Sequence, residues 1–330
     1  MGIRWSLPVI PRFYGVFDGR GQALSHLTIS GMSHYLGLFG RLESGAVVRD
    51  LVLVDANVGR GRYVGALAGE NAGTVRGCVS SGAVGEALIL GGPVGRNFGD
   101  VTDCHNDATV ANSGSAGGLL GENGGQIVRC ANTGTVRPGT DVHRHVYVGG
   151  LVGCNFAIVT QCYNRGFVDA VVDSPWPMPG NTAGLVGYNS GVVTDCYSTG
   201  QVSASGSKVG GLAGCNSGRL TRCYSAGLIN NPGQSLGGLV GFDRAPSRTG
   251  SGRQGEAVGC FWDTQASGKA ASAGGTGKTT EQMQTVATFT DAGWDFVGET
   301  ANGAEDIWWI DEGRDYPRLW WEAVELILDD

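Results

Sequence analysis

Cysteine is the residue type in this chain whose chemistry and spacing stand out first. A thiolate can bind a metal ion, attack a substrate or oxidise to a disulfide. The 330 residues include 9 cysteines, and no two of them form a Cys-x-x-Cys pair, which excludes zinc-ribbon and thioredoxin-type sites. One column of cysteines occupies the same position in successive copies of a repeated segment: Cys78, Cys104, Cys130, Cys162, Cys196 and Cys223.

Three interpretations of this column are open: a ladder of buried thiols, disulfides between neighbouring repeats, and a metal site. Stacked repeats would place successive Cα atoms roughly 4.8 Å apart, a distance that a disulfide tolerates. Side chains in register on parallel strands point the same way, however, which suits neither a disulfide nor ligands that must converge on a metal. We therefore expect a buried thiol ladder and no metal or cofactor. Cys154 and Cys215 fall outside the column and could be surface thiols.

Asparagine forms a second column, at the eighth position of each repeat. Asparagine tolerates left-handed turns and bonds to its neighbours' backbone, and identical amides stacked above one another can bond to each other. We expect a structural role for this column, whose members are Asn71, Asn97, Asn123, Asn155, Asn189 and Asn216. A further column is rich in threonine, but Arg76 and Val128 interrupt it, which argues against a flat ice-binding face.

The sequence contains no recognisable catalytic constellation. The 5 histidines form no HExxH zinc motif. Residues 233–237 spell G-x-S-x-G but lie in a turn rather than between a strand and a helix. The glycine-rich residues 274–279 lack the first glycine of a phosphate loop, because Ser272 stands there. Asp103 and Asp195 share a repeat position, but we expect them three coils apart, too far to act as a pair.

The columns belong to a repeated sequence motif whose core is Gly-Gly-Leu-Val-Gly. An imperfect copy of the motif starts at Tyr35 and a truncated copy at Leu236. Apolar pieces rich in Val, Thr and Leu predict short strands, and such copies can bury their apolar side only by stacking. We expect an all-β fold, a parallel β-solenoid (β-helix) of about seven to eight coils. The full copies begin at Val64, Leu90, Ala116, Val148, Thr182 and Val209.

We divide the chain into three regions. Residues 1–34 form an N-terminal coil or lead-in, residues 35–243 the solenoid repeats, and residues 244–330 a linker and C-terminal capping region. The last region is rich in aromatic residues and is expected to cap the solenoid, because open strand edges promote aggregation. Thr279 and Gln282 have the spacing of a capping box at the start of a short helix.

Composition excludes some functions. The net charge is −7 and only 16% of residues are charged, without a basic stripe, so we expect no nucleic-acid partner. No apolar run approaches the length of a membrane-spanning helix. The first residues lack the continuous apolar segment of a signal peptide.

The repeat spacing lengthens at two places, residues 137–147 and 169–181. Extra residues must leave a stacked coil as loops on one side, and these two inserts are neighbours in the stack. We expect them to project side by side as a binding surface that includes His143, Arg144, His145, Tyr147, Trp176 and Met178.

The copies resemble the bacterial GLUG repeat, which is named for its Gly-Leu-hydrophobic-Gly core. Residues 184–187, 211–214 and 238–241 match this core, and the Asn-x-Gly and Cys-Tyr elements that follow also fit. The resemblance implies large secreted or surface proteins, adhesin-like chains and regions beside immunoglobulin A peptidase domains. In those proteins the repeats look like stalk or binding modules rather than the catalytic part.

We therefore expect a non-enzymatic extracellular or cell-surface β-solenoid that serves in adhesion or matrix structure, or that binds polysaccharides or cell-surface glycans. One alternative is a polysaccharide lyase or hydrolase on a β-helix scaffold, which would need carboxylates and a base converging in one groove. Another is self-association into filaments through stacking of coil ends, which a C-terminal cap should oppose.

Overall fold

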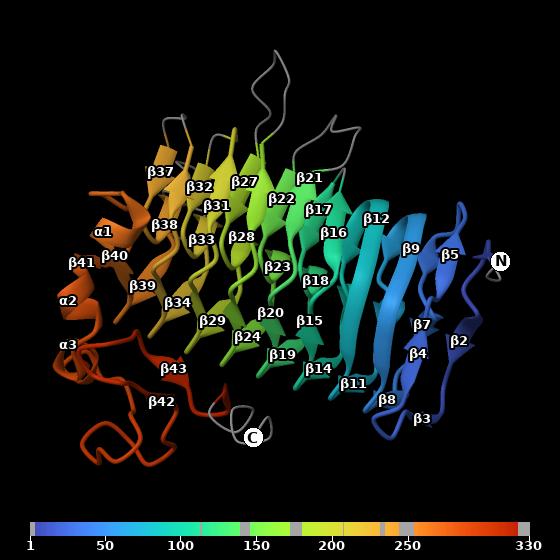
Figure 1. Ribbon diagram of the computed structural model, residues 1–330, viewed down its shortest axis with the longest axis horizontal. Coiled ribbons are helices and arrows are strands. Elements are labelled where there is room, and N and C mark those ends of the chain that lie inside the picture. The colour runs from blue at the N-terminus through green and yellow to red at the C-terminus, as the bar shows by residue number, and fades with distance from the viewer. Residues whose placement is uncertain are drawn as a thin grey trace.

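The computed structural model describes residues 4–112, 114–138, 146–171, 180–206, 208–231, 235–243 and 254–322. In these residues the chain winds into a parallel β-solenoid, which confirms the predicted fold class. Figure 1 shows the coils stacked into a rod, with the N-terminus at one end and the helices at the other.

Two sheets of the solenoid each contain nine strands in the described residues. The first sheet consists of β2 (Ile10–Phe13), β7 (Phe39–Leu42), β10 (Ala68–Asn71), β13 (Val94–Asn97), β18 (Leu120–Asn123), β23 (Val152–Asn155), β28 (Val186–Asn189), β33 (Ala213–Asn216) and β38 (Val240–Asp243). The second consists of β3 (Val16–Asp18), β8 (Val47–Arg49), β11 (Thr74–Arg76), β14 (Asp100–Thr102), β19 (Gln126–Val128), β24 (Ile158–Thr160), β29 (Val192–Thr194), β34 (Arg219–Thr221) and β39 (Glu256–Val258).

The third sheet has 23 strands in the described residues and receives two or three short strands from most coils. They are β1 (Arg4–Trp5), β4 (Ala23–Ser25), β5 (Thr28–Ser30), β6 (Tyr35–Leu36), β9 (Val52–Val64), β12 (Val79–Gly91), β15 (His105–Asn106), β16 (Thr109–Asn112), β17 (Ser115–Gly117), β20 (Ala131–Asn132), β21 (Val136–Pro138), β22 (Val146–Gly149), β25 (Tyr163–Asn164), β26 (Val168–Ala170), β27 (Gly180–Ala183), β30 (Tyr197–Ser198), β31 (Val202–Ala204), β32 (Lys208–Gly210), β35 (Tyr224–Ser225), β36 (Ile229–Asn230), β37 (Ser235–Gly237), β40 (Phe261–Asp263) and β41 (Thr276–Lys278).

Within the described part of the chain the rod therefore has nine coils, where about seven to eight were expected. At the N-terminal end, β2 and β3 form a coil although their sequence lacks the repeated motif. At the other end, β39 completes the last coil after the break in the pattern at residue 243. Strand pairing needs only the right backbone direction and an inward apolar residue, so coils extend beyond the recognisable copies.

The interior of the rod is apolar and repeats in register. Val75 pairs with Val101, which pairs with Ile127, and all three are fully buried. Leucines of the repeated motif form another fully buried column: Leu119, Leu151, Leu185, Leu212 and Leu239. Because each coil places the same type of side chain above that of the preceding coil, the same packing arrangement repeats along the whole rod.

The residue before each cysteine of the column takes a left-handed backbone conformation. It is glycine in some coils, but Asp103, Arg129 and Gln161 adopt it with φ of 53°, 49° and 52°. A left-handed conformation costs an L-residue other than glycine roughly 1–2 kcal/mol. The sharp turn into the cysteine therefore stores backbone strain in several coils.

Gln161→Gly should relieve this strain and raise the free energy of unfolding by about 0.5–1 kcal/mol, because the gain exceeds the extra chain entropy of glycine. Gln161→Val should lower it by about 1–2 kcal/mol, since β-branched residues are poorly tolerated there. Urea unfolding monitored by circular dichroism measures both. Equal midpoints for the two variants would show that the turn is not strained.

The C-terminal part covers the end and one side of the rod (Figure 1). The strand β41 pairs with β40, and α1 (Thr264–Ser267), which lies between these strands in the chain, α2 (Thr280–Met283) and α3 (Val286–Thr290) are at the same end. The capping box of Thr279 and Gln282 is present at α2. The antiparallel pair β42 (Trp308–Trp309) and β43 (Arg318–Leu319) lies along the side instead. No helix in the described residues is long and apolar enough to cross a membrane.

A column of aromatic residues explains this sideways packing. Tyr163, Tyr197 and Tyr224 stack on successive coils, with ring centroids 5.1 and 5.0 Å apart. Trp321 stacks on Tyr163 at 5.4 Å and Trp308 lies 6.2 Å from Tyr197. The aromatic C-terminal residues thus bury a lateral stripe of the solenoid as well as its end.

Candidate functional site

The cysteine column is buried along its whole length and extends one coil further than the repeats suggested, to Cys260. Each thiol has a hydrogen-bond partner: the Cys104 Sγ donates to the Thr102 carbonyl at 3.1 Å, and the Cys104 amide donates to the Cys130 Sγ at 3.4 Å. Burial raises the pKa of Cys130, so this thiol stays neutral. The nine cysteines are free thiols, and no metal-binding cluster occurs among the described residues.

The asparagine column is a continuous chain of buried amides. The side-chain amide nitrogen of each of the first five asparagines donates to the Oδ1 of the next, at 2.8, 2.9, 2.9, 2.9 and 2.8 Å along the column. Each Oδ1 also accepts a backbone N–H two residues later, as Asn123 does from Gly125 at 3.2 Å. The column therefore ties neighbouring coils together and holds the turn within each coil.

A second buried column was not recognised in the sequence. Asn106 donates to Asn132 and Asn132 donates to Asn164, both at 2.8 Å, and Ser80 donates to Asn106 at 2.8 Å. The spacing could have revealed this column, since its asparagines follow a column cysteine by two residues. Serine takes the same position in other coils, as in Ser80 and Ser198, and this substitution hides the pattern in the sequence.

The glycine-rich core of each repeat forms a concave corner. At Gly121 a Cβ atom would come within 2.6 Å of the Leu90 nitrogen and 2.7 Å of the Ile89 side chain, so only glycine fits there. The corner brings two outward columns face to face, and we call the space between them the groove. One column is Tyr35, Tyr63, Ile89, Ser115, Tyr147, Asn181 and Lys208; the other is Arg41, Glu70, Arg96, Glu122, Cys154, Tyr188, Cys215 and Phe242.

The N-terminal half of the groove is filled by paired charges and stacked rings. Glu70, with 3% of its side chain exposed, accepts from Arg41 at 2.8 Å and from the Arg96 Nε at 3.0 Å. The Arg96 guanidinium lies 4.1 Å from the centre of the Tyr63 ring, which stacks on Tyr35 at 5.4 Å. Glu70 engages both guanidinium groups, and the Arg41 Nε, which has no hydrogen-bond partner among the described residues, is buried, so this half of the groove leaves little for a ligand.

The C-terminal half of the groove is open and aromatic. It holds a pocket of about 370 Å³ lined by Tyr147, Cys154, Phe156, Asn181, Tyr188, Lys208, Cys215 and Phe242. The rings of Tyr147 and Phe156 lie 5.7 and 6.3 Å from that of Tyr188. None of the eight lining residues is acidic, and Lys208 is their only side chain with a fixed charge.

The prediction that Cys154 and Cys215 could be surface thiols is wrong, since they are 2% and 3% exposed. They do point outward from the sheet, but the groove encloses them. Burial raises the pKa of Cys154 to about 12, and its Sγ lies 3.9 Å from the Ser115 Oγ. Both thiols are therefore part of the pocket wall rather than reactive surface groups.

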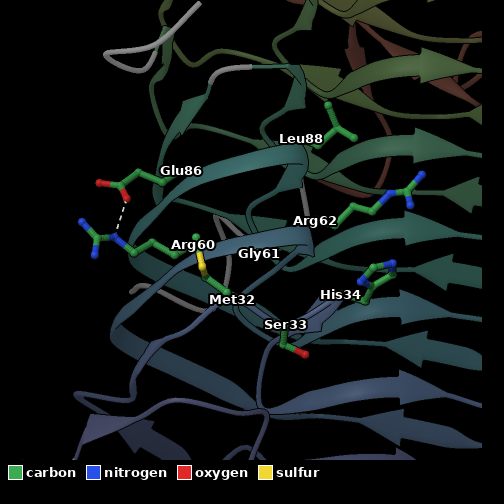
Figure 2. A pocket seen from close by; sticks show the side chains of 8 residues that line it. All are labelled: Met32, Ser33, His34, Arg60, Gly61, Arg62, Glu86 and Leu88. Atoms are coloured by element: carbon green, nitrogen blue, oxygen red, sulfur yellow. Dashed lines mark hydrogen bonds and ion pairs between the residues drawn. The ribbon is translucent and has the colours of Figure 1, made fainter.

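A larger hollow of about 600 Å³ lies near the N-terminal end, lined by Met32, Ser33, His34, Arg60, Gly61, Arg62, Glu86 and Leu88. Figure 2 shows that its polar side chains do not converge. Arg60 and Glu86 pair at 2.7 Å on one side, whereas His34 and Arg62 point to the other. This arrangement does not assemble an acid and a base around a common point.

A third hollow, of about 310 Å³, is lined on one side by Arg165 and Tyr197 of the rod and on the other by residues 315–318 of the C-terminal part. Glu322 reaches both: it pairs with Arg165 and accepts from the Tyr197 hydroxyl at 2.9 Å. Burial raises the pKa of Glu322, and the same cause raises that of Tyr197. These groups hold the C-terminal residues around Glu322 against the rod.

The residues proposed from the inserts fall mostly outside the described residues: His143, Arg144, His145, Trp176 and Met178. Tyr147 is described and lies in the groove, in the pocket wall.

The two aspartates of the shared repeat position are apart, as expected. Asp103 pairs with Arg129 at 2.6 Å, and Asp195 pairs with Arg222 at 2.7 Å.

Comparison with known proteins agrees with the sequence analysis. Residues 179–203, which include β27 and β28, match the family described as the GLUG motif, which confirms the predicted resemblance to GLUG-repeat proteins. A stretch of 75 residues is 41% identical to halomucin of Haloquadratum walsbyi (strain DSM 16790 / HBSQ001) and covers 22% of this chain. The matched stretch represents 1% of the length of halomucin. No solved structure matches the chain significantly.

Asn132→Ala should lower the free energy of unfolding by about 2–3 kcal/mol, because it removes three buried hydrogen bonds: the one from the Asn106 amide, the one to the Asn164 Oδ1 and the one to the Gly134 carbonyl. Asn57→Ala is the matched control, since Asn57 is exposed on β9 and its loss should change stability by less than about 0.5 kcal/mol. Urea unfolding compares the two. Equal losses would contradict a stabilising amide column.

Proposed function

We propose that this chain is a rigid, non-enzymatic module of an extracellular or cell-surface protein, and that it serves in adhesion or surface matrix by binding glycans. The GLUG motif and the similarity to halomucin support a surface-type repeat protein. The nine-coil rod suits a module that holds a binding surface at a fixed distance from its attachment.

The observation that carries the glycan part is the aromatic pocket of the groove. In the N-terminal half of the groove Arg41 and Arg96 pair with Glu70, whereas this pocket keeps accessible rings and polar groups. Phe156 is 54% exposed although it is a large apolar residue. Tyrosines, an amide and a lysine beside such rings suit a ligand with both apolar faces and hydroxyl groups. Tyr147, at the end of the first insert, lines the pocket, so the binding surface predicted from the inserts and the pocket share this residue.

Binding of the whole chain to a glycan array tests the proposal. A variant in which residues 139–145 and 172–179 are replaced by short Gly-Ser links should bind the retained glycan at least about tenfold more weakly. Circular dichroism checks that the variant is folded. Retention of no glycan at all, or unchanged binding by the folded variant, would contradict the proposal.

The same preparations should release no product from acidic or neutral polysaccharides in reducing-end and unsaturated-uronide assays. Turnover would favour the lyase or hydrolase alternative.

Self-association is a second candidate, favoured by the N-terminal end of the rod. Here β2 and β3 are the outermost strands of their sheets in the described residues. Leu7, Tyr14 and Val16 are 61%, 64% and 67% exposed beside them. An apolar strand edge can pair with another chain. Because β41 and the helices occupy the opposite end, such pairing would join two N-terminal ends in a dimer rather than build a filament.

Val16→Lys should abolish a concentration-dependent dimer, since it places a charge on the pairing edge. Val192→Lys is the matched control, because Val192 is 39% exposed on the same sheet in the middle of the rod. Sedimentation velocity over a range of concentrations measures both. A monomer at every concentration, or a dimer that survives Val16→Lys, would rule out this mode.

A further inference from the structure

We propose that the aromatic half of the groove binds an anionic sugar residue within a linear polysaccharide, with Lys208 as the partner of its carboxylate or sulfate. The inference rests on the proposed function and narrows it to a ligand class and to named residues.

The first step concerns the rings. Tyr147, Phe156 and Tyr188 come from three different segments and meet around one point, with interplanar angles of 44° and 59° relative to Tyr188. Their faces are tilted rather than stacked tightly, so ring surface remains toward the pocket. A pyranose ring has an apolar face of C–H groups, and burying it against aromatic carbon is favourable.

The second step concerns charge. The Lys208 ammonium lies 4.4 Å from the centre of the Phe242 ring, which holds it in the pocket wall. Within the described residues it forms no ion pair with a carboxylate, in contrast to Arg41 and Arg96 in the other half. With no acidic residue among the lining side chains, the pocket carries a positive charge that an anionic ligand would neutralise.

The third step concerns direction and length. The groove runs along the rod axis, and its columns repeat roughly every 4.8 Å. That repeat is close to the length of one sugar residue in an extended polysaccharide, so a chain lying in the groove would place about one sugar on each coil. Arg41, Glu70 and Arg96 fill the groove on the N-terminal side. The stretch of this column that lines the pocket, from Cys154 to Phe242, covers four coils, which suits a linear tetrasaccharide.

Isothermal titration of the full chain with oligosaccharides of four residues tests this inference. The probes are a galacturonate tetramer, a sulfated tetramer and neutral cellotetraose. We expect at least one anionic tetramer to bind about tenfold more tightly than cellotetraose, and the comparison of the two anions identifies the charged group.

The variants separate the roles of charge and ring. Lys208→Gln should remove the preference for the anionic tetramer and leave binding of the neutral one unchanged. Lys278→Gln is the matched control, since Lys278 also lies over a ring, that of Phe261, at 5.5 Å but outside the groove. Phe156→Ala should weaken all tetramers. Its matched control is Phe98→Ala, because Phe98 holds the same repeat position and is 53% exposed beside the filled half.

Unchanged affinity for the anionic tetramer in Lys208→Gln, or an equal loss in Phe98→Ala and Phe156→Ala, would overturn the inference. If the chain is retained on the glycan array while these variants bind normally, the groove assignment fails and the proposed function stands. If no glycan is retained by the intact chain, both fail.

Discussion

The structure depends on one interaction, the hydrogen bond between stacked asparagine amides on neighbouring coils. An amide that donates to the coil beside it and accepts from its own turn is satisfied only if every coil has the same height and register. A buried amide out of register would lose its partners, which costs more than an apolar contact of the same size. The amide column therefore fixes register, whereas the leucine, valine and cysteine columns provide the apolar burial.

Fixed register turns a local feature of the repeat into a feature of the whole rod. The glycine corner would be only a sharp turn in one coil. Repeated in register, it becomes a groove whose two walls are columns of outward side chains. These side chains do not contribute to the core, so they can vary from coil to coil without loss of the fold. In one half Arg41 and Arg96 pair with Glu70, and in the other half the rings around Tyr188 remain accessible. The repeat provides the scaffold, and its variable columns provide the chemistry.

Features that repeat with the coil could be predicted from the sequence. The class of fold and the alignment of Asn123 with Asn155 follow from period and residue type alone. The groove could not be predicted, because the depth of the corner depends on how closely the backbone of the next coil approaches Gly121. For the same reason the outward position of Cys154 suggested exposure, although the neighbouring wall buries it. The packing of Trp321 on Tyr163 joins a residue of a repeat to one far along the chain and outside the repeats, so the repeat pattern could not predict this contact.

Hydrogen exchange of asparagine side-chain amides, followed by nuclear magnetic resonance, tests the role of the amide column most directly. The account predicts that the Nδ2 protons of Asn97, Asn123 and Asn155 exchange orders of magnitude more slowly than those of exposed Asn57, and that their protection is similar from coil to coil. Exchange of the column amides as fast as that of Asn57, under conditions where the rod remains folded, would contradict it.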